Sequence, residues 1–236
     1  DVTTDQPIMS DVDLADNAIT QILGSGLYSL VDTAQYHTIF EGRSRESIFE
    51  LSMSEASKEG SNAHIANMFL RTSHIAYVGT NSRNFVTQEY LSNHFSRVED
   101  VWDWYWINNG WVWTSMPSKK MDGSDLRFRN NFTDIATNAP GCIKYRNVVY
   151  RNPSQERDAY ISNNMIIFRL SDMQLLKAEI ALYRDNVNGA VEIINNSRRR
   201  YNAHSSNILA ATGLSKSTVM YEYMLERGKE MYLEGH

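Results

Sequence analysis

Residues 166–202 read IIFRLSDMQLLKAEIALYRDNVNGAVEIINNSRRRYN, and they decide the fold class because they hold two helical patterns joined by a short link. Apolar residues at intervals of three and four predict one helix over 166–184 and another over 189–202. The first helix is expected to bury Leu170, Met173, Leu176, Ile180 and Tyr183. The second is expected to bury Ala190, Ile193, Ile194, Ser197 and Tyr201. The link DNVN is so short that the helices must fold back as an antiparallel hairpin.

Small residues at the expected crossing of these helices, such as Ala178, Ala181 and Ala190, are typical of one unit of a tetratricopeptide-type array. No repeat occurs at a fixed period, so the array would be irregular. The same spacing predicts a helix over 11–23, a short one after it, and a last helix from about Ser217 to the end.

The middle of the chain carries weaker patterns. IFEL (48–51) and IKYRNVVYR (143–151) fit short strands, and FVTQEYLSNHFSRV (85–98) fits a helix capped by Thr87. PSKKMDGSDLRF (117–128) predicts a turn-rich connection, and 57–84 shows no clear pattern. We therefore predict a mainly α fold in one domain, with irregular tetratricopeptide-like helix pairs at about 11–40 and 165–236. An irregular lobe at about 52–160 would contain short strands or a hairpin.

Composition excludes several classes of function. The formal net charge of −5 argues against a nucleic-acid partner, and the single Cys142 excludes a disulfide within the chain. The six histidines show no metal-ligand spacing, and no nucleophile or phosphate-binding motif is present, so we expect no metal, no cofactor and no catalytic site. No apolar run is long enough to span a membrane. Both ends of the chain look cut, since it begins without methionine.

All five tryptophans lie in VWDWYWINNGWVW (101–113). As a helix this window would scatter them, whereas a hairpin turning at Asn109-Gly110 would set Trp106 opposite Trp113. Because side chains alternate along a strand, one face of that hairpin would hold Trp102, Trp104, Trp106, Trp111 and Trp113. The other face would hold Asp103, Tyr105, Ile107, Val112 and Thr114. The hairpin is favoured because one alternation rule places every tryptophan.

An indole ring offers a broad apolar surface and one N–H donor, which suits the C–H face and hydroxyl rim of a sugar. The ring would take the C–H face, and Asn108, Asn109, Asp103 and Tyr105 would supply polar contacts. In the alternative interpretation the indoles pack on the helices as core. Glu99, Asp100 and Asp103 are better explained as a solvated strand end than as a glycosidase pair. Arg169 with Asp172, and Arg198–Arg200 with Glu192, are expected to form structural ion pairs.

Several segments resemble a known family. IFRLSDMQLLKAE (167–179), GAVEIINNSRRRYNA (189–203) and ERGKEMYLEGH (226–236) resemble consecutive marks of the SusD/RagB outer-membrane lipoproteins of Bacteroidetes. Residues 15–51, VTQEYLSNHF (86–95) and SDLRF (124–128) resemble its upstream marks, in family order. The chain departs from the family in its Trp-rich insertion between Phe95 and Asp125.

The resemblance implies a helical fold and a binding protein with no enzymatic activity. It implies a site on the extracellular face of the outer membrane, held by a lipid anchor outside this chain, with a SusC-like TonB-dependent transporter as partner. The ligand it implies is an oligosaccharide held by aromatic side chains of the irregular lobe. Two alternatives stay open: capture of peptides, as in RagB-like proteins, and a helical-repeat scaffold whose indole face docks a protein.

Overall fold

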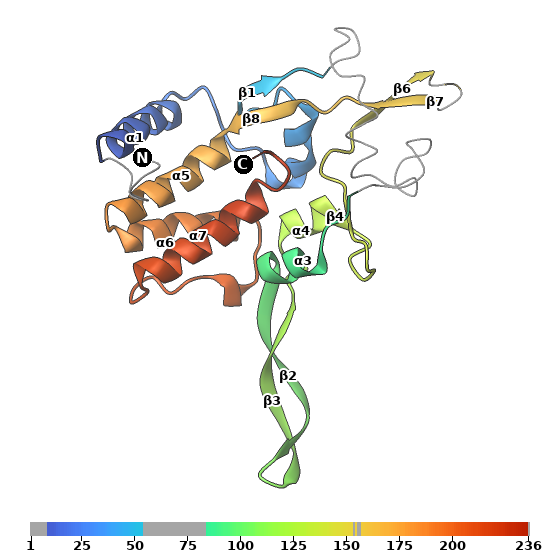
Figure 1. Ribbon diagram of the computed structural model, residues 1–236, viewed down its shortest axis with the longest axis vertical. Helices are drawn as coiled ribbons and strands as arrows, with labels where there is room; N and C mark the ends of the chain where they lie inside the picture. The colour runs from blue at the N-terminus through green and yellow to red at the C-terminus, as the bar shows by residue number, and fades with distance from the viewer. Residues whose placement is uncertain (1–8, 54–83, 153, 155–156, 236) are drawn as a thin grey trace.

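The computed structural model describes residues 9–53, 84–152, 154 and 157–235. Its main body is a layer of helices: α1 (Met9–Gly24), α5 (Leu170–Tyr183), α6 (Val187–Arg200) and α7 (Lys216–Glu230). In this layer α5 contacts α1 on one side and α6 and α7 on the other (Figure 1). The predicted mainly α fold and the predicted α5–α6 hairpin are confirmed. Residues 57–83 of the segment that showed no clear pattern, and residues 54–83, 153 and 155–156 of the predicted lobe, lie outside the described residues.

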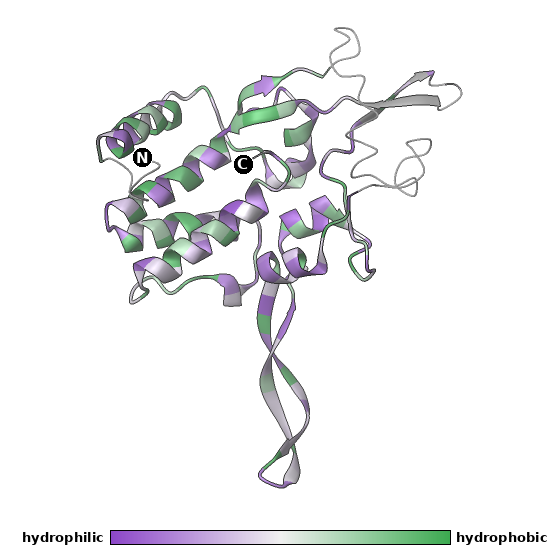
Figure 2. Ribbon diagram, in the orientation of Figure 1, coloured by the Kyte–Doolittle hydropathy of each residue, from purple (hydrophilic) through white to green (hydrophobic). Residues whose placement is uncertain are grey.

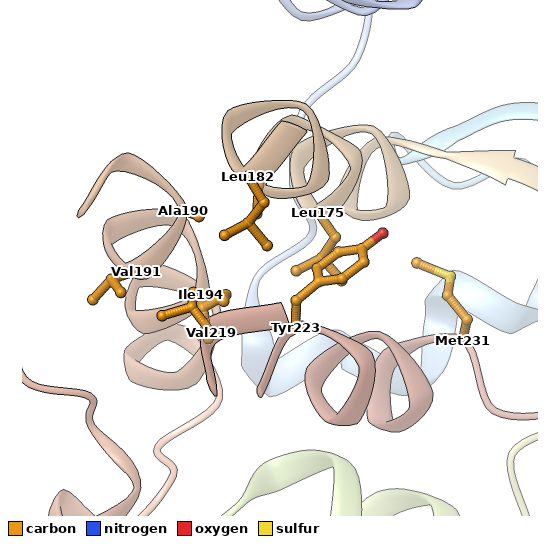
Figure 3. Packing of buried hydrophobic residues seen from close by; sticks show 9 residues of the cluster. Leu175, Leu182, Ala190, Val191, Ile194, Val219, Tyr223 and Met231 are labelled. Carbon is orange, nitrogen blue, oxygen red and sulfur yellow. The ribbon is translucent and has the colours of Figure 1, made fainter. Parts of the chain in front are cut away.

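The core of the helical layer forms where α5, α6 and α7 meet. Its buried side chains point into one cluster (Figure 3), which contains Leu175, Ala178, Leu182, Ala190, Val191, Ile194, Val219, Tyr223 and Met231. Two of the residues expected to be buried on α5, Leu176 and Tyr183, instead pack at the edge of a second cluster with α1. The single stripe predicted for α5 was too narrow because the helix is covered on two sides.

Short helices and paired strands make up the rest. The helices are η1 (Thr33–Glu41), α3 (Gln88–His94), α4 (Leu126–Asn131) and η2 (Ser205–Asn207). The pairs are β1 (Ser47–Leu51) with β8 (Met165–Arg169), β2 (Ser96–Ile107) with β3 (Gly110–Met121), β4 (Phe132–Thr133) with β5 (Gly141–Cys142), and β6 (Val148–Asn152) with β7 (Arg157–Ile161), all antiparallel.

Several predicted boundaries were wrong. The helix expected from residue 166 begins at Leu170, because 165–169 pairs with β1 as strand β8. The segment from Pro117 to Met121 is strand and not a turn-rich connection, because the long hairpin continues through it. The last helix ends at Glu230, and the residues after it form a turn. In the first two cases pairing with another strand decided the local structure.

Carboxylates of the C-terminal segment enter the interior and meet buried cations there. The guanidinium of Arg127 contacts Glu226 at 2.8 Å and Glu230 at 3.1 Å, and Arg127 is fully buried. Arg169 contacts Glu230 at 2.6 Å and Glu234 at 2.7 Å. These contacts tie the end of the chain to α4 and to the β8–α5 junction.

The same network reaches α6 and the strand region. Arg198 on α6 contacts Glu226 at 3.0 Å, and Lys144 contacts Glu234 at 2.5 Å. The ion-pair partners predicted from helical spacing were therefore wrong: Asp172 pairs with Arg227 of α7 instead of Arg169. Spacing along one helix identifies only neighbours on that helix, whereas burial brought charges together from separate elements.

Removing one carboxylate of this network should destabilise the fold strongly. Glu230→Gln leaves Arg169 and Arg127 buried beside a neutral amide, and breaking such a buried pair costs about 3–5 kcal/mol. Arg184→Ala, which loses its partly exposed contacts to Asp13 and Asp16, is the control and should change stability far less. Urea unfolding followed by circular dichroism measures both. An equal loss in the two variants would contradict a structural role for the buried network.

Acid should weaken the same network. Burial alone would raise the pKa of Glu230, but the guanidinium groups of Arg169 and Arg127 lower it from 4.5 to about 2. A carboxyl whose folded pKa is depressed stabilises the fold above its unfolded pKa and loses that contribution as the pH falls to its folded pKa. The free energy of unfolding should therefore fall between pH 4.5 and about 2. In Glu230→Gln this dependence should be shallower, and an unchanged dependence would argue against the assignment.

Candidate functional site

The hairpin of β2 and β3 extends away from the helical body (Figure 1), and by the strand pairing its tryptophans lie in the half nearer the turn. Its turn is formed by Asn108 and Asn109, whose φ angles are 51° and 66°. A two-residue type I′ turn needs positive φ at both positions, and asparagine adopts it more readily than most residues. The hairpin was predicted, but its turn was placed one residue too late, because Gly110 lies in β3 opposite Ile107.

The correct register still puts all five indoles on one face. Trp106 lies opposite Trp111, Trp104 opposite Trp113, and Trp102 opposite Ser115. The expected partner of Trp106 was Trp113, two residues further along β3. A shift of two residues along a strand keeps every side chain on its own face. The prediction of the face therefore held although the prediction of the pairs was wrong.

Proline and two hydrogen bonds show which backbone groups face outward. Pro117 has no N–H, so its pairing with Asp100 must be a position that exchanges no hydrogen bonds across the hairpin. The N–H of Val98 donates outward to Ser206 Oγ at 3.1 Å, and that of Trp104 donates to Asp103 Oδ1 at 2.8 Å. Hydrogen-bonded and non-hydrogen-bonded pairs alternate along an antiparallel hairpin. The tryptophan pairs lie an even number of positions from the Asp100–Pro117 pair, so they are also non-hydrogen-bonded, and side chains approach most closely at such pairs.

The indoles touch one another across the strands and remain open to solvent. Trp104 and Trp113 have ring centroids 5.7 Å apart at 62°, and Trp106 and Trp111 are 5.5 Å apart at 74°, both edge to face. The exposed fractions of the five residues range from 53% to 64%. The alternative that the indoles pack as core is therefore wrong. Figure 2, which is coloured by hydropathy, shows few strongly hydrophobic residues along the hairpin, because tryptophan has a near-neutral hydropathy value.

The predicted polar partners are distributed differently. Asp103 and Tyr105 face away from the indoles, and the hydroxyl of Tyr105 donates to the carbonyl of Val101 at 3.2 Å. Asn108 and Asn109 form the turn at the tip. The polar residues that share the indole face are Ser96, Asp100, Ser115 and Lys119. Ser115 was not among the predicted site residues, although extending the same alternation along β3 would have found it.

The base of the hairpin is fastened to the body by one buried carboxylate. Asp122 accepts hydrogen bonds from the backbone N–H of His204 and from the side chain of Asn207, each at 2.8 Å. The carbonyl of Asn207 in turn accepts from Arg198 at 2.6 Å. A continuous set of polar contacts thus connects the hairpin to the buried ion network, and it fixes where the indole face stands.

Other features of the described residues offer no comparable site. A cavity of about 400 Å³ lies between α1, α5 and α6, and another of about 230 Å³ lies beside Lys144; neither is lined by an indole. No cluster of three or more His, Cys, Asp and Glu side chains within the described segments could hold a metal ion. No helix in the same segments is long and apolar enough to cross a membrane. Burial raises the pKa of the Cys142 thiol to about 11, so it stays protonated.

A sequence model of the SusD family matches residues 45–236. The chain belongs to the SusD family. Solved structures agree in fold: a SusD homolog from Bacteroides thetaiotaomicron has 20% sequence identity and a TM-score of 0.68, over 97% of this chain and 44% of its own. A SusD superfamily protein from Bacteroides fragilis has 21% identity and a TM-score of 0.60, over 97% and 47%.

A SusD-like carbohydrate binding protein from Bacteroides vulgatus has 16% identity and a TM-score of 0.53, over 96% of this chain and 40% of its own. The family predicted from the sequence marks is thus confirmed, and at these identities the structural likeness establishes the shared fold. This SusD family chain spans less than half the length of these solved structures. None of the curated proteins matches it.

The paired indoles should give a spectroscopic signature. Edge-to-face indoles at this separation couple electronically and produce a paired positive and negative band in the far-ultraviolet circular dichroism. Trp104→Ala combined with Trp106→Ala should remove that band pair, because Trp113 and Trp111 then lose their cross-strand partners. Trp102→Ala should keep it, because Trp102 stands opposite Ser115. Loss of the band in Trp102→Ala would contradict the observed pairing.

Proposed function

We propose that this SusD family chain captures oligosaccharides at the bacterial cell surface and delivers them to a SusC-like TonB-dependent transporter. The single observation that carries the proposal is the exposed face with five indoles on the hairpin. An apolar patch of this kind on a soluble surface marks an interaction site. The chain would act by binding alone, with no cofactor, at the extracellular face of the outer membrane, and a lipid anchor would provide its contact with the membrane.

The chemistry of the indole face suits a sugar. Indole rings stack on the C–H face of a pyranose, while the hydroxyl of Ser115 opposite Trp102 and the carboxylate of Asp100 on the next pair of that face can reach hydroxyls of the bound chain. Covering about 50 Å² of an indole stabilises a complex by about 1 kcal/mol, at about 25 cal/mol per Å². One indole would therefore bind weakly, whereas several used together would give useful affinity.

A second candidate, a peptide or protein partner, is favoured by the outer edge of β3. Backbone groups of Trp111, Trp113 and Ser115 point away from β2, because these residues belong to non-hydrogen-bonded pairs. An extended peptide could add as a third strand along that edge. The equivalent edge of β2 is partly used by Ser206 and Asp103. This candidate covers both peptide capture and a scaffold that docks a protein.

Binding measurements separate these candidates. Soluble malto-, cello-, xylo- and manno-oligosaccharides should shift tryptophan fluorescence, and isothermal titration should give an affinity for at least one of these series. Trp104→Ala combined with Trp106→Ala should weaken that affinity by at least about tenfold, the equivalent of about 1.4 kcal/mol.

Val112→Ala is the matched control, since Val112 lies on the other face of the same hairpin. Its affinity should equal that of the unmodified chain. Unchanged binding in the double tryptophan variant would remove the indole face as the site. A response to extended peptides and to none of the sugars would favour the second candidate.

A further inference from the structure

The five indoles form a stripe that runs lengthwise along the hairpin. They occupy three successive pairs of one face, from Trp102 near the middle of β2 to Trp106 near the tip. Four residues of antiparallel strand at about 3.4 Å each make this stripe about 14 Å long. A ligand that used every pair would need to be extended along the hairpin, since no single sugar ring reaches that far.

The stripe is not flat. Within each tryptophan pair the two rings meet at 62° or 74°, so one ring shows its face where its partner shows its edge. The hairpin itself is strongly twisted (Figure 1), as two-stranded ribbons usually are. Successive pairs therefore face progressively different directions. A ligand must bend and turn to follow them, which a single flexible chain can do and a rigid flat surface cannot.

The stripe is also open at its sides and both ends. Each indole is more than half exposed, and beyond Trp102 the face continues with Asp100 and Lys119. The two cavities described above are lined by other residues. No wall stands at either end of the stripe among the described residues, so nothing there would recognise the terminus of a chain.

The charges along this face balance. Asp100 and Lys119 carry opposite signs on adjacent pairs, and Arg97 on the opposite face is paired with Glu99 at 2.7 Å. A polyanionic glycan would need a cluster of unpaired cations to bind, and a polycationic one would need a cluster of carboxylates. The indole face offers neither, which fits a neutral chain.

Resting on the proposed function, we propose that the ligand is a single, soluble, neutral and linear glycan chain, bound along its middle by at least three consecutive sugar rings. Each of the two tryptophan pairs stacks one sugar ring on its exposed indole face. The Trp102–Ser115 pair stacks a third sugar ring on Trp102, with the hydroxyl of Ser115 beside it. Flat faces of crystalline polysaccharides and isolated chain ends are excluded as ligands by the same geometry.

A series of chain lengths tests this inference. Within the oligosaccharide series that binds, affinity should rise at least about tenfold between two and four rings and then level off. Borohydride reduction of the terminal ring of the six-ring chain should leave its affinity unchanged. Microcrystalline cellulose and crystalline chitin should not sediment the protein.

Trp102→Ala supplies the residue-level test. It should lower the affinity for the four-ring chain several-fold and the affinity for the two-ring chain by less, because short chains can bind to the two remaining tryptophan pairs. The circular dichroism band of those pairs serves as evidence that the hairpin of this variant is still formed. Val112→Ala should leave the whole length dependence intact.

The outcomes distinguish a failure of this inference from a failure of the proposed function on which it rests. If no sugar series binds, the proposed function fails and the inference fails with it. If sugars bind but two rings bind as tightly as four, or reduction abolishes binding, the function stands and binding along the middle of a chain is overturned. Sedimentation with the crystalline fibres, or tighter binding of polyanionic chains, would likewise overturn the inference alone.

Discussion

Three carboxylates of the C-terminal segment, Glu226, Glu230 and Glu234, hold this structure together from the inside. All three are buried, and their partners come from α4, the strand region, the β8–α5 junction and α6. Burying so many charges is favourable only if every group is paired, which the contacts achieve with charge-assisted hydrogen bonds. The network therefore specifies one arrangement of elements that are distant in sequence.

The position of the hairpin follows from this arrangement. Arg198 connects Glu226 to the carbonyl of Asn207, and Asn207 connects to Asp122 at the base of the hairpin. Met121 at the end of β3 packs against an apolar cluster that contains Leu91, Phe95 and Phe128. An isolated two-stranded hairpin is at best marginally stable in water, so its cross-strand indole pairs and this anchored base both matter. A rigid body thus presents a surface whose largest side chains stay exposed.

Local patterns in the sequence were sufficient for much of this. Helical spacing located α1, α5, α6 and α7, because a buried face repeats with the period of the helix. Strand alternation placed all five indoles on one face, and that conclusion survived an error in the turn because the pairing shifted by two residues. The sequence marks also identified the SusD family, and the family model confirms it.

Other features were decided only by tertiary structure, because they depend on partners that no local pattern reveals. Residues 165–169 are strand because β1 lies beside them, and Arg169 pairs with Glu230 and Glu234 because folding buries all three together. Asp103 and Tyr105 are turned from the indoles while Asp100, Ser115 and Lys119 share their face. By itself the sequence determined which residues repeat on one side of an element; the packed structure decided what each side meets, since burial and register are properties of two elements at once.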